Sequence, residues 1–475
     1  MIETMASLKV NDRMHIWAEA APGIPFVARA GKQVEGCGLR LLWENLTKKD
    51  PTMLDKNFVR ENLDFVREKL AARGGQYPLD ELVAADTEWK GIIIRSEELR
   101  RQRNEATEEI GKMKRAGHDT AAQQARVKEI SGEIKSLEEG ARLVEERLNA
   151  LLHSIPNLPN DSVPVGPDET ANLEVRRWGT APSLDFTPLD HVDLGSSLGI
   201  LDMERAAKIA GARFALLCGA GALMERALIN FMLDVHTKYH GYREVMPPLM
   251  ANATSLFGTG NLPKFAEDLF KVEDTNYYLI PTAEVPVTNM YRDEILDGDK
   301  LPIHHVAYTS CFRREKMSAG RDVRGIKRGH QFDKVEMVKL VRPETSMDEL
   351  ATLIDNAEDV CRGLGIPHRI IQMCTGDLSF TAAVKYDVEI WAPGCQEWLE
   401  VSSCTNFMDF QARRANLRYR PAPGAKPDYV HTLNGSGLAL PRVMIAVLET
   451  YQQSDGSITM PEVLRPYMGG LERIG

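Results

Sequence analysis

The sequence predicts an α+β protein in which an antiparallel helical hairpin precedes a domain built on a mostly antiparallel sheet. Apolar residues recur at spacings of three and four over about 79–155, which predicts the hairpin. Strand-like and helix-like segments then mix without a regular alternation, which predicts the sheet domain. At 475 residues the chain is too long for one ordinary core, so we expect more than one domain.

Residues 1–52 show no sustained hydrophobic period and are interrupted by glycine and proline. Met53 then opens a well-patterned segment, so we expect the preceding stretch to be a disordered tail or the result of a start codon placed too far upstream. Its acidic residues make a targeting sequence the weaker alternative. The predicted divisions are this extension, a hairpin domain over 53–160 and a second domain over 161–475.

The hairpin prediction depends on two heptad-like series, over 82–113 and 127–151. Between them, Gly117 suits the end of one helix and Asp119 the start of the next. The apolar seam is narrow and buries little surface. We therefore expect two long antiparallel helices that form a coiled-coil arm.

Basic residues are frequent on both predicted helices, with acidic residues among them. In a coiled coil of unknown function this pattern is typical of a solvated surface. The formal net charge of -10 also argues against nonspecific binding of polyanions by the whole surface, although it is compatible with a local basic stripe. The arm alone therefore does not predict an RNA partner.

A proline-rich connector with Pro156, Pro159, Pro164, Pro167 and Pro182 predicts an extended linker into the second domain. Strand candidates there are 277–280, 335–340 and 387–391, which favour a largely antiparallel sheet flanked by helices. A helix is expected over about 223–240. Its apolar stripe suits either a subunit interface or the core of one subunit, and consists of Met224, Leu228, Phe231 and Val235.

The composition, with 43% hydrophobic and 27% charged residues, is typical of a soluble globular protein. No apolar run approaches the roughly 20 residues of a membrane-spanning helix. Seven cysteines without CxxC pairs predict reduced thiols in a cytoplasmic protein. The two common glycine-rich phosphate-binding motifs are missing, so a bound nucleotide would be held mainly by side chains.

Several short motifs occur in order in the second predicted domain. They are GYREVMPP at 241–248, TAE at 282–284, CFRRE at 311–315, GRDVRG at 320–325, HQFDKVE at 330–336, EVSSCTN at 400–406 and NGSGLALPR at 434–442. Each is weak evidence alone. Together, and with the hairpin in front of them, they resemble the motifs of bacterial-type seryl-tRNA synthetases, members of the class II aminoacyl-tRNA synthetases. The resemblance covers residues 53 to about 470.

This resemblance implies a class II catalytic domain and an ATP-dependent, AMP-forming ligase. Such an enzyme activates L-serine to seryl-adenylate with release of pyrophosphate, then transfers serine to the 3′ end of tRNA(Ser), with tRNA(Sec) as a second candidate substrate. It also implies a cytoplasmic homodimer without a membrane or DNA partner.

Two other classes of protein share parts of the pattern. A ligase that loads a carrier protein would lack the arm, so the intact heptads argue against it. A catalytically silent RNA-binding homologue would have lost some of the charged motif residues. All of these are present, namely Arg313, Glu315, Glu336, Glu400 and Arg442.

The resemblance assigns the ATP site. Negative charge builds on the α-phosphate during attack by the serine carboxylate, and fixed cations stabilise it. Arg313 and Arg442 are the expected catalytic residues, while Glu400 and Ser403 are the expected Mg²⁺ ligands because they offer hard oxygens. The expected ATP contacts are Arg313, Arg314, Glu315, Phe332, Glu400, Val401, Ser402, Ser403 and Arg442.

The resemblance assigns the serine site as well. Thr282, Ala283 and Glu284 are expected around the ammonium group, and Glu336 and Ser436 at the hydroxyl, with Arg313 on the carboxylate. A pocket that buries partners for a hydroxyl rejects alanine, because those partners would be left unpaired. Threonine must instead be excluded by the shape of the pocket.

In the family the arm binds tRNA by shape and backbone, which calls for basic side chains. The expected tRNA contacts are Arg95, Arg100, Arg103 and Lys114.

An unusual branch of the family carries zinc, and its site would need cysteine grouped with histidine or glutamate. No zinc is expected here, because no such grouping is evident in the sequence around Cys361, Cys374, Cys395 and Cys404.

Overall fold

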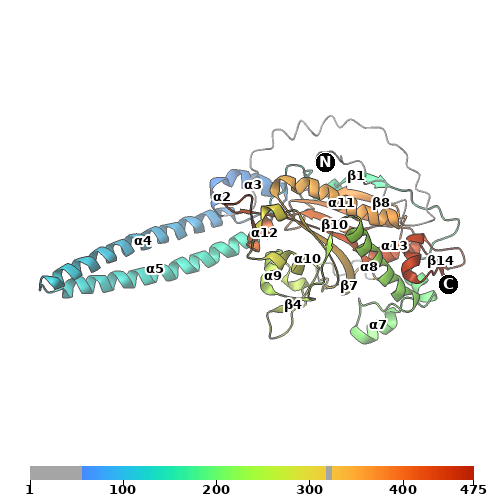
Figure 1. Cartoon of the computed structure of the whole chain (residues 1–475), viewed down its shortest axis with the longest axis horizontal. Helices are drawn as coiled ribbons and strands as arrows, with labels where there is room; N and C mark the ends of the chain where they lie inside the picture. The colour runs from blue at the N-terminus through green and yellow to red at the C-terminus, as the bar shows by residue number, and fades with distance from the viewer. Residues whose placement is uncertain (1–55, 317–323) are drawn as a thin grey trace, which may run out of the picture. The chain divides into compact units, whose positions relative to one another are not determined.

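The computed structural model describes residues 56–316 and 324–475, drawn in Figure 1. The predicted extension over 1–52 lies outside the described residues. The expected combination of a helical hairpin and a largely antiparallel sheet with flanking helices is confirmed.

The N-terminal helices are α2 (Lys56–Glu61), α3 (Leu63–Ala72), α4 (Leu79–Arg115) and α5 (Ala121–Ser154). Helices α4 and α5 run side by side as the predicted hairpin (Figure 1). Gly117 adopts φ 77°, which ends α4. The Asp119 carboxylate accepts a hydrogen bond of 3.0 Å from the backbone N–H of Ala121. Both expected turn residues therefore act at the predicted break.

The hairpin is packed most firmly at its base. There Val66 and Leu70 of α3 join Leu82 of α4 and Leu148 of α5 in one apolar cluster. Farther out, the buried apolar contacts narrow to a seam of Leu99, Ile130 and Ile134 with Leu137 packed against it. The base therefore has a core of its own, while the outer part depends on side chains of the two helices alone.

The base of the hairpin is tied to the sheet domain by Arg73. Its guanidinium group donates to the carbonyl oxygens of Asn157 and Ala382, each at 3.1 Å, and to that of Leu378 at 3.0 Å. Five N–H donors on a planar guanidinium suit such a cluster of acceptors. The Asn157 amide donates in turn to the carbonyl oxygens of Thr381 and Phe407.

One eight-stranded sheet dominates the second part of the chain. Every pair of neighbouring strands is antiparallel except β2 and β6, which are parallel. In spatial order the strands are β1 (Leu173–Trp178), β8 (His368–Gln372), β9 (Val384–Ala392), β10 (Glu397–Asn406), β13 (His431–Ala439), β7 (Gln331–Val341), β6 (Ile303–Phe312) and β2 (Arg243–Glu244). The predicted strands over 335–340 and 387–391 are confirmed as parts of β7 and β9.

Smaller strands and helices complete the domain. The strands are β3 (Met250–Asn252), β4 (Tyr277–Leu279), β5 (Ile295–Asp297), β11 (Arg418–Arg420), β12 (Asp428–Tyr429), β14 (Ile458–Thr459) and β15 (Arg473–Ile474). The helices are α6 (His191–Ser197), α7 (Met203–Ala210), α8 (Ala220–Lys238), α9 (Ala253–Gly258), α10 (Glu284–Thr288), α11 (Ser346–Gly363), α12 (Phe410–Arg414) and α13 (Leu440–Thr450).

Helices α8, α11 and α13 pack against the large sheet and share its main apolar core (Figure 1). All four residues of the apolar stripe on α8 are buried in this core. The stripe therefore belongs to the core of one subunit and not to a subunit interface, the other role that the sequence left open. Across 56–316 and 324–475, no helix combines the length and apolar character needed to cross a membrane.

Candidate active site

A cavity of about 280 Å³ opens where β7, β10 and β13 meet the start of α13. It brings together most of the predicted site residues although they are spread over 130 positions of the chain. The predicted residues in its lining are Arg313, Glu315, Phe332, Glu400, Val401, Ser403, Ser436 and Arg442. The remaining lining residues are Ile326, Lys327, Arg328, Gly329, Lys334, Ala439 and Pro441, none of which the sequence analysis assigned.

Strand β7 supplies three side chains to the site at alternate positions, Phe332, Lys334 and Glu336. Side chains two residues apart on a strand lie on the same face, so Lys334 is bracketed by two predicted site residues. It is 6% exposed and lines the cavity. The alternation of the strand was a signal in the sequence that would have identified it.

Arg313 follows directly after β6 and is held from two sides. Its backbone N–H donates to the His330 carbonyl oxygen at 2.9 Å, and its Nε donates to the Pro281 carbonyl oxygen at 3.2 Å. The guanidinium carbon lies 5.2 Å from the centre of the Phe332 ring. A planar cation over an aromatic face leaves the terminal N–H groups of Arg313 available for an anion.

Arg442 stands in the first turn of α13. Its Nη1 donates to the Glu400 carbonyl oxygen at 2.6 Å, and its Nε lies 3.5 Å from the Lys327 carbonyl oxygen. Burial would raise the pKa of the Glu400 carboxyl, but the nearby Lys385, Arg442 and Arg313 outweigh burial and hold it below the usual value. The Glu400 carboxylate is therefore charged at neutral pH in the middle of a cluster of cations.

A β-bulge in β10 decides which of its polar side chains reach the cavity. The pairing with β9 shifts register between Glu400 and Ser402, and Ser403 comes to pair with Asp387. Regular alternation would place residues 400 and 402 on one face, whereas the bulge brings Glu400 and Ser403 to the cavity together. Ser402 is 1% exposed, outside the cavity lining, with its Oγ 3.5 Å from the Cys404 Sγ.

Glu336 follows Lys334 on the same face of β7 and is 1% exposed, just outside the cavity lining. Its carboxylate accepts a hydrogen bond of 2.8 Å from the Asn434 amide and one of 3.3 Å from the Thr282 hydroxyl. It also forms an ion pair with Lys334. Ser436 lies directly opposite Glu336 in the β7–β13 register and lines the cavity. Three donors therefore converge on this buried carboxylate.

Glu284 lies beside this group at the start of α10. Burial, and then the neighbouring Glu336, raise the pKa of Glu284 to about 7. Its carboxylate accepts a hydrogen bond of 2.5 Å from the Gln411 amide. Ala283, which precedes it, is fully buried. The segment 282–284 thus lies close to Lys334 and Glu336 but outside the lining of the cavity.

Arg314 is exposed and also lies outside the lining, because its backbone N–H is turned to the Asp268 carbonyl oxygen at 2.9 Å. On the hairpin, Arg95 and Arg100 form ion pairs with Glu133 at 3.0 Å and Glu138 at 2.7 Å on the opposite helix. The other two predicted tRNA contacts lie farther along α4, Lys114 being exposed and Arg103 partly buried.

The chain matches two family models. The seryl-tRNA synthetase N-terminal domain matches residues 53–159, and the class II tRNA synthetase core domain for G, H, P, S and T matches residues 270–451. The first therefore covers the hairpin, and the second covers most of the residues around the cavity.

Curated relatives of similar length match most of the chain in sequence. The serine–tRNA ligase of Carboxydothermus hydrogenoformans is 54% identical over 417 residues, which is 88% of this chain and 98% of the relative. The serine–tRNA ligase of Thermomicrobium roseum is 55% identical over 423 residues, or 89% of this chain and 95% of the relative.

Solved structures agree with these relatives. The crystal structure of seryl-tRNA synthetase from Pyrococcus horikoshii complexed with ATP is 39% identical with a TM-score of 0.84, covering 89% of this chain and 99% of that one. The cytoplasmic serine–tRNA ligase of Naegleria fowleri in complex with AMP is 28% identical with a TM-score of 0.80, covering 89% and 98%. The chain belongs to the seryl-tRNA synthetase family.

Proposed function

We propose that this chain activates L-serine with ATP and transfers it to tRNA(Ser). The observation that carries the proposal is the cavity itself. Its lining includes Arg313, Phe332 and Arg442, which suit a nucleotide, and Lys334, which pairs with the neighbouring Glu336 and suits a small polar molecule. We place Arg313 between the two reactants of the activation reaction, which have to meet there.

ATP occupies the part of the cavity that Arg313, Phe332 and Arg442 line. Its adenine stacks between the Phe332 ring and the guanidinium plane of Arg442, and Glu315 accepts from the adenine amino group. Arg313 binds the α-phosphate and the serine carboxylate together, which aligns the attack and stabilises the charge that develops on the phosphoryl oxygens. Arg314 and Ser402 are not proposed as contacts, because the Arg314 side chain is exposed and the Ser402 hydroxyl lies against the Cys404 thiol.

Serine lies beside Lys334 and Glu336. Glu336 and Ser436, which lie opposite each other, form hydrogen bonds with its hydroxyl. Thr282 and Glu284 hold its ammonium group, and the buried Ala283 lies between them in the sequence. Glu336 accepts from Asn434 and pairs with Lys334, and its carboxylate oxygens offer further acceptor positions to the serine hydroxyl. Alanine would leave this buried carboxylate short of a donor, which is the physical basis for its rejection.

Glu400 and Ser403 fit Mg²⁺ by their chemistry. The bulge in β10 turns a charged carboxylate and a hydroxyl into the same cavity, and both are hard oxygen ligands. These two residues would hold the ion, which supplies charge neutralisation for the ATP phosphates when bound. The surrounding Arg313 and Arg442 supply the rest of the positive charge from the chain itself.

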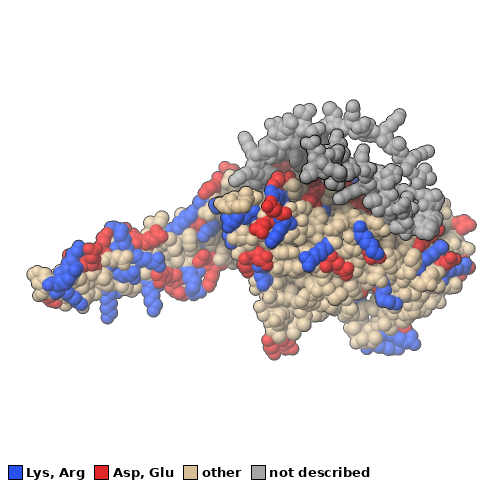
Figure 2. All heavy atoms as spheres, viewed as in Figure 1, with Lys and Arg blue, Asp and Glu red and all other residues tan. Residues whose placement is uncertain are grey.

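The hairpin binds tRNA in this proposal. Figure 2 shows basic side chains spread along it, with acidic ones among them. Arg95 and Arg100 form only exposed ion pairs, which are weak and easily exchanged for phosphate contacts. Arg103 and Lys114 extend the basic surface toward the tip.

A homodimer is also proposed. The segment after α8 leaves large apolar side chains exposed, with Met246 at 88%, Met250 at 53% and Leu249 at 43%. Apolar side chains gathered on one exposed segment are typical of a surface that a partner covers. We place the second copy of the chain on this segment.

The test is pyrophosphate exchange with each of the twenty amino acids, followed by charging of tRNA(Ser) and tRNA(Sec) side by side. Exchange that depends on serine, with transfer to tRNA(Ser), would support the proposal, and the parallel assay decides whether tRNA(Sec) is a second substrate. Exchange without transfer would favour a carrier-protein ligase. The absence of exchange with every amino acid would contradict the enzymatic proposal altogether.

A further inference from the structure

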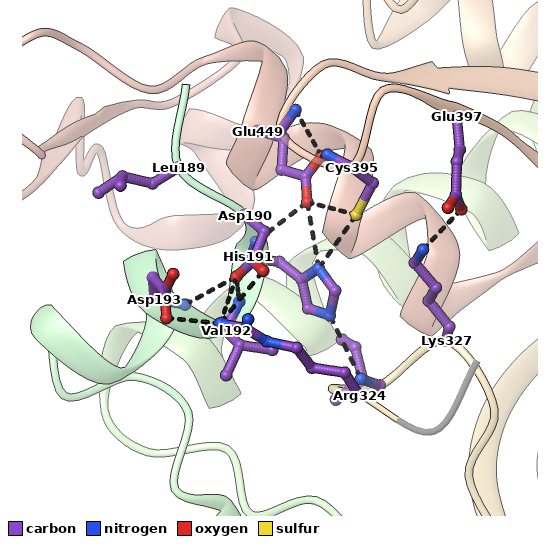
Figure 3. A network of polar contacts seen from close by, with 12 residues as sticks. Leu189, Asp190, His191, Val192, Asp193, Arg324, Lys327, Cys395, Glu397 and Glu449 are labelled. Carbon is purple, nitrogen blue, oxygen red and sulfur yellow. Dashed lines mark hydrogen bonds and ion pairs between the residues drawn. The ribbon is translucent and has the colours of Figure 1, made fainter. Parts of the chain in front are cut away.

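A buried polar network joins α6, α13 and the β9–β10 turn beside the cavity (Figure 3). Its centre is Glu449 in the last turn of α13, with 0% exposure. One carboxylate oxygen accepts from the backbone N–H groups of Gly394 and Cys395, both at 2.9 Å. The other accepts from the His191 backbone N–H at 3.0 Å and lies 3.1 Å from the His191 Nδ1.

The network reaches the cavity through the other nitrogen of the His191 ring. Because the Ile326 N–H donates to Nε2, that nitrogen offers its lone pair and Nδ1 carries the ring proton toward Glu449. The backbone N–H of Ile326 points at that lone pair from 3.4 Å. Gly325 adopts φ 72°, and a Cβ added to it would lie 2.0 Å from the same nitrogen. The backbone at 325–326 therefore rests directly on the ring.

The segment that rests on His191 is also a wall of the cavity. Ile326, Lys327 and Arg328 all line the cavity, and the Lys327 carbonyl oxygen lies 3.5 Å from Nε of Arg442. On either side of the ring contact, Arg324 pairs with Asp193 at 2.7 Å and Lys327 pairs with Glu397 at 2.6 Å (Figure 3). The Arg324–Asp193 pair is exposed and contributes little. The buried ring contact and the partly buried Lys327 pair are therefore the fixed points of the segment.

We propose that His191, held in one tautomer and orientation by Glu449, is a positioning residue for ATP binding. It touches no substrate. It fixes the backbone over 325–327, and thereby the wall that Lys327, Arg328 and Arg442 present to the nucleotide. The inference rests on the proposed function in one respect, namely that ATP is the ligand of this cavity.

The same cluster raises the question of a metal, because ligand atoms of His191, Cys395 and Glu449 lie within 4.8 Å of one another. Two observations favour the hydrogen-bonded state. A metal on Nδ1 would move the ring proton to Nε2, where it would face the N–H of Ile326. The Cys395 thiol also donates to Glu449 at 3.0 Å, and burial, with Glu449, raises the pKa of this thiol to about 12.

The test compares His191→Ala and His191→Gln in the full-length protein. Calorimetry with ATP and Mg²⁺ gives the Kd for ATP, and pyrophosphate exchange gives the KM for serine. His191→Ala should raise the Kd for ATP about tenfold, the upper range for one hydrogen bond and its packing, with the serine KM changed less than about twofold. His191→Gln places an amide oxygen near the position of Nε2 and should recover most of the ATP affinity.

His368→Ala is the matched control. His368 is also fully buried against a glutamate, Glu358, at 3.1 Å, but it lies outside the cavity. His368→Ala should lower the melting temperature about as much as His191→Ala does, while leaving the Kd for ATP unchanged. A structural effect alone would weaken ATP binding in both variants or would not be rescued by glutamine, and either result would overturn the proposal.

Other outcomes are equally decisive. An unchanged Kd for ATP in His191→Ala would overturn the inference, as would one equivalent of zinc in the purified wild type that is lost in Cys395→Ser. A wild type that binds ATP but shows no exchange with serine would overturn the proposed function, while the ratio of Kd values would still decide the role of His191. A wild type that binds no ATP would overturn both.

Discussion

The ammonium nitrogen of Lys334, which lines the cavity, lies 2.9 Å from the hydroxyl oxygen of Thr282. The same ammonium group pairs with Glu336. Lys334 therefore joins the group proposed for the serine ammonium to the group proposed for the serine hydroxyl. We expect Lys334→Met to raise the KM for serine at least about tenfold in pyrophosphate exchange, because removing one partner of a buried ion pair leaves the other uncompensated.

Lys339→Met is the control for this variant. Lys339 lies on the same strand and is 1% exposed, but it pairs with Glu349 and lies outside the cavity. It should destabilise the fold without changing the KM for serine. Equal changes in the KM for serine in the two lysine variants would show that Lys334 acts only through stability.

Arg313→Ala should reduce serine-dependent pyrophosphate exchange by about 10²- to 10³-fold, the usual cost of removing a preorganised donor to the developing charge. Arg313→Lys should restore little, since an ammonium group cannot bind two anions in one plane. Circular dichroism would verify that the fold is retained. The neighbouring Arg314→Ala is expected to change the rate less than about threefold, because its side chain lies outside the cavity. Near-normal exchange in Arg313→Ala would rule out its assigned role.

The pH dependence of serine binding should report on Glu284. The pKa of this carboxyl is about 7, so it loses its negative charge as the pH falls through neutrality and no longer attracts the serine ammonium group. The KM for serine should therefore rise as the pH is lowered from about 8 to 6.

Glu284→Gln should flatten that rise. The pKa of Asp387, next to Glu400, is also raised to about 7, chiefly by burial, so the comparison is best made between wild type and this variant on the same substrate. An unchanged pH profile in Glu284→Gln would assign the titration to another group.

The hairpin should be dispensable for activation and essential for charging. Replacing residues 96–136 by a short glycine linker removes the outer part and keeps the apolar cluster at the base, which includes Leu82 and Leu148. Pyrophosphate exchange should stay within about twofold of wild type, whereas charging of tRNA(Ser) should fall at least about a hundredfold as the phosphate contacts are lost. Efficient charging by the shortened protein would contradict the role given to the arm.

The sequence predicted the hairpin and the core strands because both depend on local periodicity. It also contained the signal for Lys334, which follows Phe332 and precedes Glu336 on one face of β7. The sequence could not show which of Ser402 and Ser403 faces the cavity, because a bulge at this point of β10 breaks the regular alternation of side chains between the two faces of the strand. The contact of Glu449 with His191 spans 258 positions and exists only through the fold.

Helix α13 carries Arg442 in its first turn and Glu449 in its last, with a continuous apolar side buried in the core between them. One helix therefore holds both Arg442, which lines the cavity, and Glu449, which holds His191. A shift of α13 would displace both side chains together. A large-to-small substitution at Val443 or Val447 would leave a packing void beneath α13. Such a variant would lose activity as an active-site variant does, although neither side chain lines the ligand cavity.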